Sequence, residues 1–116
     1  MNVPPTPSSL SPATLQILIS LADRERHGYA ILRDIADRTA DAFPIGPATL
    51  YTSIKRMLAA GWIEPCEAAK GASVDPRRRL YRLTAVGREV ARQEIRRLER
   101  VVAQGRRRLP AARSHA

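Results

Sequence analysis

The chain has 116 residues, which is enough for one modest hydrophobic core and excludes a large multidomain assembly. With 44% hydrophobic and 27% charged residues, its composition is that of a folding chain and excludes a disordered polycation. No apolar run reaches the roughly eighteen residues of a membrane span. Residues 1–11 lack the basic and apolar parts of a signal peptide, so we expect a cytoplasmic protein with no membrane partner.

Positive charge is concentrated in the second half of the sequence. The formal net charge is +9, and residues 1–60 hold six basic and five acidic groups against fourteen and six in residues 61–116. A basic half on a small domain indicates a polyanionic partner.

The first helix is predicted to begin at Ser11, an N-cap residue followed by Pro12 at the first helical position. Its apolar residues recur at helical spacing on two sides, which is typical of a helix buried between neighbours: Leu15, Leu18, Ile19 and Ala22, then Ile17 and Leu21.

A turn at His27 and Gly28 precedes a second predicted helix over 29–39. We expect its core stripe to contain Tyr29, Leu32 and Ala36, with Ile31 and Ile35 beside them. Its solvent face is predicted to carry Arg33, Asp34, Asp37 and Arg38.

The third predicted helix starts at Gly46 and Pro47 and stops at Gly61. Its spacing directs four apolar residues toward the core: Leu50, Ile54, Met57 and Leu58.

A hairpin follows the third helix. The predicted strands are 62–67, which Pro65 marks as an edge, and 77–83, where Tyr81 and Leu83 share one face and Arg82 takes the other. Thr84 is expected to cap a final helix that runs to about Leu109, before Pro110 ends it.

Three helices, a basic hairpin and a closing helix make the order of a winged helix-turn-helix. The predicted fold class is therefore mainly α with a small β-hairpin, plus a long C-terminal dimerisation helix. In this fold the third helix lies in the major groove of double-stranded DNA and the hairpin lies against a neighbouring groove or the backbone. The predicted DNA-binding residues are Thr49, Tyr51, Thr52, Lys55, Arg56, Arg77, Arg78 and Arg79. The alternative function is a protein-interaction module whose basic face binds an acidic protein.

Four segments carry a family resemblance: His27–Ile31, Gly46–Tyr51, Leu58–Ile63 and Arg79–Arg88. In this order and spacing they resemble the PadR family of bacterial regulators. The resemblance implies a winged-helix dimer that represses promoters and in some members responds to small aromatic or drug-like effectors. On that basis Trp62 and Phe43 are candidate walls of an effector site, although both are also ordinary core residues.

The final helix carries an apolar seam with heptad spacing that predicts a homodimer. The seam consists of Ala91, Ile95, Leu98, Val102, Gly105 and Leu109. The positions between them are heavily charged, and we expect their carboxylates, including Glu94, on the solvent-exposed surface. The alternative is that this helix packs back on the first helix of its own chain. The predicted domains are a tail over 1–10, a winged helix over 11–84, a dimerisation helix over 85–109 and a tail over 110–116.

Nothing in the sequence predicts an enzyme, a metal site or a cofactor. The two histidines, His27 and His115, lie in a turn and near the chain end, and no zinc-protease, phosphate-loop or nucleophile-elbow motif occurs. Cys66 is the only cysteine, which excludes an internal disulfide and a cysteine metal cluster, and we expect a half-buried thiol there.

Overall fold

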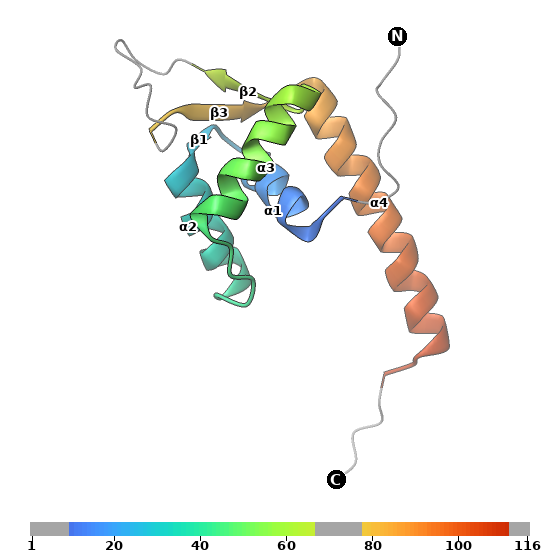
Figure 1. Cartoon of the computed structure of the whole chain (residues 1–116). Helices are drawn as coiled ribbons and strands as arrows, with labels where there is room; N and C mark the ends of the chain where they lie inside the picture. Colours follow the sequence, from blue (N-terminus) through green and yellow to red (C-terminus); the bar gives the residue numbers. More distant parts are fainter. Residues whose placement is uncertain (1–9, 67–77, 112–116) are drawn as a thin grey trace.

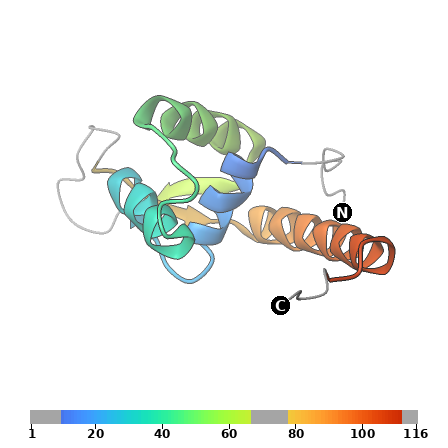
Figure 2. The same cartoon turned by 90° about the horizontal axis from the view of Figure 1, so that it is seen from below.

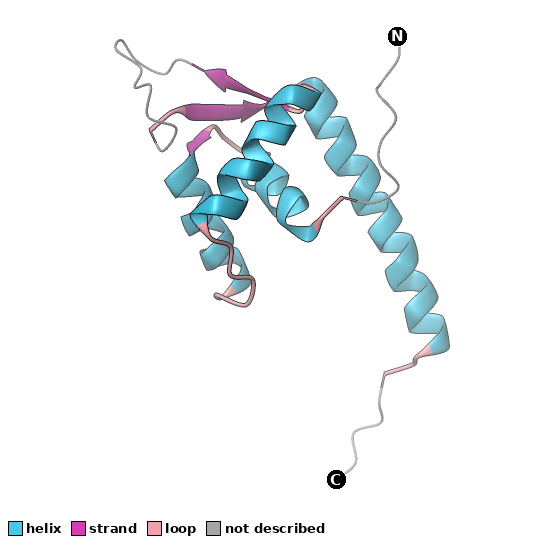
Figure 3. Ribbon diagram, in the orientation of Figure 1, coloured by secondary structure: helices cyan, strands magenta, loops and turns pink. Residues whose placement is uncertain are grey.

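The computed structural model describes residues 10–66 and 78–111 (Figure 1). Helices dominate, and one small sheet lies at the end of the domain (Figure 3). The elements are α1 (Pro12–Ser20), β1 (Arg26–His27), α2 (Gly28–Thr39), α3 (Pro47–Ala60), β2 (Ile63–Cys66), β3 (Leu80–Leu83) and α4 (Ala85–Arg108). The predicted class, mainly α with a small hairpin and a long last helix, is confirmed.

Capping residues begin and end the helices where the sequence predicted. The Ser11 Oγ accepts a hydrogen bond from the Thr14 N–H at 3.1 Å, and Pro12 occupies the first turn of α1. Gly61 ends α3 in the left-handed conformation, with φ of 77°, which glycine adopts without steric cost.

The core stripe of α2 differs from the predicted one. Ile31 and Ile35 are fully buried together with Gly28, whereas Tyr29 is 61% exposed. Each helical residue turns the side-chain direction by about 100°, so Tyr29 points roughly opposite to Ile31. The placement of Tyr29 in the core was therefore wrong.

The sheet has three antiparallel strands in the order β1-β3-β2. The predicted hairpin is β2 and β3, with Pro65 opposite Tyr81, and β2 is an edge strand as Pro65 indicated. Strand β1 was not predicted, because two residues are too few to show an alternating pattern. It pairs Arg26 with Tyr81 and His27 with Leu80.

The core lies among α1, α2, α3, the inner face of the sheet and the first half of α4. The four apolar residues predicted for α3 all face it: Leu50, Ile54 and Met57 are buried and Leu58 is partly buried. Tyr81 is buried while its neighbour Arg82 is exposed, as the alternation predicted.

Two residues near α4 were placed wrongly from sequence. Leu10, assigned to the N-terminal tail, is a core residue, and its N–H lies 3.4 Å from the Glu94 Oε2. Glu94, assigned to the charged surface of the last helix, is only 4% exposed. The Arg97 guanidinium donates two hydrogen bonds to its carboxylate, at 2.9 and 2.7 Å, and lowers the pKa of Glu94 despite its burial.

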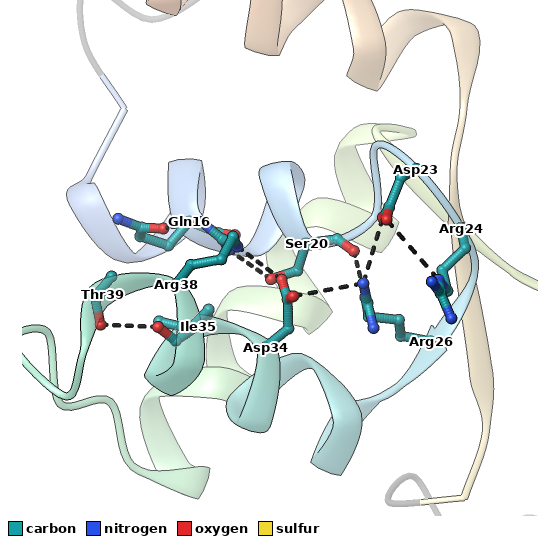
Figure 4. Close-up of polar contacts among 9 residues, drawn as sticks. All are labelled: Gln16, Ser20, Asp23, Arg24, Arg26, Asp34, Ile35, Arg38 and Thr39. Atoms are coloured by element: carbon teal, nitrogen blue, oxygen red, sulfur yellow. Dashed lines mark hydrogen bonds and ion pairs between the residues drawn. The ribbon is translucent and has the colours of Figure 1, made fainter.

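A polar cluster fixes α2 against α1 and β1 (Figure 4). The Asp34 carboxylate lies 2.8 Å from the Arg38 Nε and 3.4 Å from an Arg26 nitrogen. Arg38 also donates to the Ser20 Oγ at 2.8 Å and to the Gln16 carbonyl at 3.0 Å. Burial would raise the pKa of Asp34, but the interactions with Arg38, Ser20 and Arg26 lower it. Asp34 therefore faces this cluster, whereas the sequence placed it on the solvent face.

The second half of α4 extends away from the domain (Figures 1 and 2). Pro110 follows its last turn, as predicted. Within the described ranges, no helix combines the length and apolar character needed to cross a bilayer.

Candidate nucleic-acid interface

The outer face of α3 is polar and exposed. Thr49, Thr52, Lys55 and Arg56 are all exposed, on the side opposite the buried Leu50, Ile54 and Met57 side chains. Residues 47–60 include two basic residues and no acidic residue, so a phosphate backbone would meet no repulsive charge from α3 itself. The N-cap residue of α3, Gly46, has no side chain to accept hydrogen bonds from the backbone N–H groups of the first turn. These N–H groups can therefore donate to a phosphate.

Tyr51 lies at the border between this face and the core. It is partly buried, and its hydroxyl group packs directly over Gly28 at the start of α2. A Cβ atom at position 28 would lie only 2.6 Å from the Tyr51 Oη, which explains why glycine fits here. Tyr51 thus joins α3 to α2, and only part of its ring surface is available to a ligand.

The basic end of the hairpin lies next to these helices. Arg78 is exposed and Arg79 is half-buried at the entry to β3, whereas Arg77 lies outside the described residues. His27 pairs with Leu80 on β3, and Gly28 follows it directly beneath Tyr51. One continuous set of contacts therefore joins α3, through Gly28 and β1, to the strand that carries the hairpin arginines.

Arg82, on the outer face of the same strand, has an acidic partner. Its Nε lies 2.6 Å from the Glu64 carboxylate, in the register that sets the two residues side by side. The hydrogen bond and charge of Glu64 raise the pKa of Arg82. The neighbouring carboxylate compensates part of its charge, so we do not count Arg82 among the interface residues.

The predicted dimer seam is mostly accessible. Ile95, Val102 and Leu109 are 40, 49 and 78% exposed, and Leu98 is partly exposed. Ala91 is only 8% exposed within the core of its own chain, so it offers little surface to a partner. The buried residues of α4 lie in its first half, and α1 and α4 are in contact, as the alternative of packing against the chain's own first helix expected.

An apolar groove runs between α1 and the second half of α4. It has a volume of about 740 Å³ and is lined by Leu15, Ile19, Ile95, Leu98, Glu99, Val102, Ala103 and Arg106. The contribution of α1 was not predicted, although the apolar residues on two sides of this helix, Leu15 and Ile19 among them, were the signal for it.

The two candidate effector residues are not brought together. Phe43 lines a separate, smaller cavity with Leu32 and Ile45, at the turn between α2 and α3. Trp62 packs against the core beyond the end of α3. Neither residue lines the apolar groove.

Cys66 is half-buried, as predicted. Its thiol donates to a Glu25 carboxylate oxygen at 3.0 Å. Burial first, and then the hydrogen bond and charge of Glu25, raise its pKa to about 11, so the thiol stays protonated at neutral pH.

A helix-turn-helix with an exposed second helix and an adjoining basic hairpin defines the winged-helix class of DNA-binding transcription regulators. The model of the transcriptional regulator PadR-like family matches residues 17–93. The chain therefore belongs to the PadR-like family, as its motifs indicated.

Three comparisons illustrate this relationship. An uncharacterised protein from Lysinibacillus sphaericus is 36% identical over 73 residues, which cover 62% of this chain and 64% of that protein. A PadR family transcription regulator from Clostridium difficile R20291 is similar at 27% identity and a TM-score of 0.62, covering 81% of this chain and 97% of that one. A transcriptional regulator from Clostridium thermocellum shares the fold at 23% identity and a TM-score of 0.69, covering 84% and 89%.

Proposed function

We propose that the chain represses transcription as a homodimer, with α3 of each subunit in the major groove of an operator. The observation that supports this most directly is the exposed, acid-free polar face of α3, joined through Gly28 and β1 to the basic end of the hairpin. An acidic protein partner would also be attracted by the charge, but it would not require a helix of this shape beside an arginine-bearing hairpin.

The chemistry of each side chain suggests whether it contacts bases or phosphates. Thr49 and Thr52 offer hydroxyl groups to base edges near the start of α3, with the accessible part of Tyr51 beside them. Lys55, Arg56, Arg78 and Arg79 neutralise phosphates or, at the hairpin, enter the minor groove, and we assign Arg77 to the same task.

The accessible seam on α4 supports the proposed dimer. A two-fold protein reads a pseudo-palindrome whose half-sites lie about one DNA turn, roughly 34–36 Å, apart. The groove between α1 and α4 supplies apolar area for the subunit contact. We place a flat apolar effector, if one binds, in the same groove near Ile95 and Val102 rather than near Trp62 or Phe43.

A binding titration on the chain's own upstream DNA tests the proposal. We expect footprint protection of a pseudo-palindrome by the wild-type protein, with affinity falling steeply as salt rises. Lys55→Ala should weaken binding to all DNA and reduce the salt slope by about one, whereas Thr49→Ala should also alter base preference. Lys55→Arg is the charge-conserving control.

Absence of any DNA complex at low salt would reject the proposal and favour the acidic-protein partner. Repression itself is tested with a reporter gene behind the protected sequence. Expression should rise when the regulator is removed, and a fall would indicate activation instead.

A further inference from the structure

Tyr29 is a large aromatic side chain that the core does not use. It is 61% exposed on the first turn of α2, whereas the other large apolar residues of this helix are buried or partly buried. One turn later, the exposed Arg33 places its guanidinium carbon 6.0 Å from the centre of the Tyr29 ring. The two side chains form a cation–π pair on the surface.

This pair lies beside both parts of the proposed DNA-binding surface. Tyr29 follows Gly28, which contacts Tyr51 of α3, and His27, which pairs with Leu80 just after the hairpin arginines. Figure 1 shows the first turn of α2 below the sheet and next to α3, and Figure 2 shows the same arrangement from below.

The charge around the pair suits a phosphate. Among the described residues, Arg33 takes part in no ion pair, while its neighbour Asp34 is engaged by Arg26 and Arg38. Asp37 is exposed one turn further along α2 and forms no ion pair with Arg33. Contact with the face of a ring leaves the N–H edge of a guanidinium free to donate, and that edge matches a phosphate group.

We propose that Tyr29 and Arg33 form a backbone clamp that binds a DNA phosphate flanking the groove occupied by α3. Arg33 donates to the phosphate oxygens, and the Tyr29 ring holds the guanidinium in place while its hydroxyl donates to the same or the next phosphate. The clamp rests on the proposed DNA-binding function and extends the interface from α3 and the hairpin onto α2. Since it contacts only the backbone, it contributes affinity and no base preference.

The test is fluorescence anisotropy with a labelled fragment of the chain's upstream DNA and an unrelated duplex of equal length. Arg33→Ala should weaken binding to both by about 3- to 10-fold and reduce the salt slope by about one, the loss of one phosphate contact. Tyr29→Ala should weaken binding less, and Tyr29→Phe should fall between Tyr29→Ala and wild type, since it keeps the ring and loses the hydroxyl.

Arg100→Ala is the matched control, because it removes one exposed arginine from α4 at a position that lines neither the apolar groove nor α3. Ethylation interference should show one backbone position at which modification weakens wild-type binding and has no effect on Arg33→Ala.

If the wild type binds DNA and Arg33→Ala behaves like Arg100→Ala, the clamp is rejected while the proposed function stands. If the wild type binds neither duplex at low salt, the proposed function fails and the clamp fails with it. A loss of affinity confined to the upstream DNA would also reject the clamp, since it would indicate base recognition. Far-ultraviolet circular dichroism of each variant verifies that the fold is intact.

Discussion

Gly87 occupies a place in α4 where no side chain fits. A Cβ atom there would lie 1.9 Å from the Trp62 carbonyl oxygen and 2.7 Å from the carbonyl carbon. That carbonyl is held in place, because it accepts hydrogen bonds from the Thr84 N–H and the Thr84 hydroxyl, both at 3.0 Å. Thr84 in turn caps α4 through the Gly87 N–H. The glycine thus permits the close crossing of helix and hairpin that orients the hairpin.

We therefore expect Gly87→Ala to destabilise the protein by about 3 kcal/mol or more, although alanine is the better helix former. Gly46→Ala is the control outside the predicted seam, because a Cβ atom at position 46 would meet nothing within 4 Å. It should destabilise the protein by no more than about 1 kcal/mol, the effect of a poorer N-cap residue. Thermal unfolding at one fixed protein concentration measures both changes. Equal effects of the two substitutions would contradict the steric argument.

At the scale of elements, a buried carboxylate connects the chain before α1 to α4. Glu94 accepts hydrogen bonds from Arg97 and from the Leu10 N–H, and these hold its pKa below the ordinary value of 4.5. A lowered pKa means that the ionised form stabilises the fold at neutral pH. This contribution is present above the unfolded-state pKa and is lost as the pH falls through the folded-state value.

Glu94→Gln should therefore lower the free energy of unfolding by about 1–3 kcal/mol at pH 7. The difference from wild type should shrink as the pH falls from the unfolded-state pKa through the lower folded-state pKa, because protons bind first to the unfolded chain and then to the folded carboxylate. Urea unfolding at pH 7 and at several acidic pH values measures this. Asp37→Asn, which changes an exposed acid on α2 away from the groove, should leave the pH dependence nearly unchanged. A constant Glu94→Gln difference at every pH would show that the role of Glu94 is packing.

Element order, caps and most of the core were predictable because they depend on local rules. Ser11, Gly61 and Thr84 carry their capping preference in their own chemistry, and the spacing of Leu50, Ile54 and Met57 is a property of any helix. The failures concern partners distant in sequence. The 84-residue separation of Leu10 and Glu94 leaves no local pattern, and β1 exists only because β3 lies beside it. Tyr29 was misplaced because α2 has two neighbouring apolar stripes, one through Leu32 and one through Ile31. Packing against α1 and α3 buries the Ile31 stripe and leaves Tyr29 exposed.

The candidate interface was likewise predictable where it depends on local spacing and not where it depends on contacts between elements. The exposed face of α3 follows from its buried face, so Thr49, Thr52, Lys55 and Arg56 could be predicted from periodicity alone. The half-buried position of Tyr51 could not, because it depends on Gly28 in another helix. In the same way, the apolar spacing of α4 indicated an apolar stripe on this helix, but only the folded chain shows that Leu15 and Ile19 of α1 line a groove with it.

At the scale of the whole molecule, two adjacent valines of α4 offer a direct test of the proposed dimer. Val101 and Val102 are both 49% exposed, but only Val102 lines the groove with Leu15 and Ile19. Burying a large apolar side chain stabilises an interface by about 1.5–3 kcal/mol, and a two-fold contact buries each residue twice. Aspartate at position 102 would also place a charge in this apolar contact on both sides of the interface, and burial of a charge is costly.

If the proposed dimer forms through this groove, we expect Val102→Asp to be a folded monomer and Val101→Asp to remain dimeric. Light scattering coupled to size-exclusion chromatography measures the mass, and circular dichroism verifies the helices. The monomer should bind a full pseudo-palindrome no more tightly than an isolated half-site, because the advantage of a second linked site is lost. A dimeric Val102→Asp, or equal dissociation of both variants, would place the subunit contact elsewhere on the molecule.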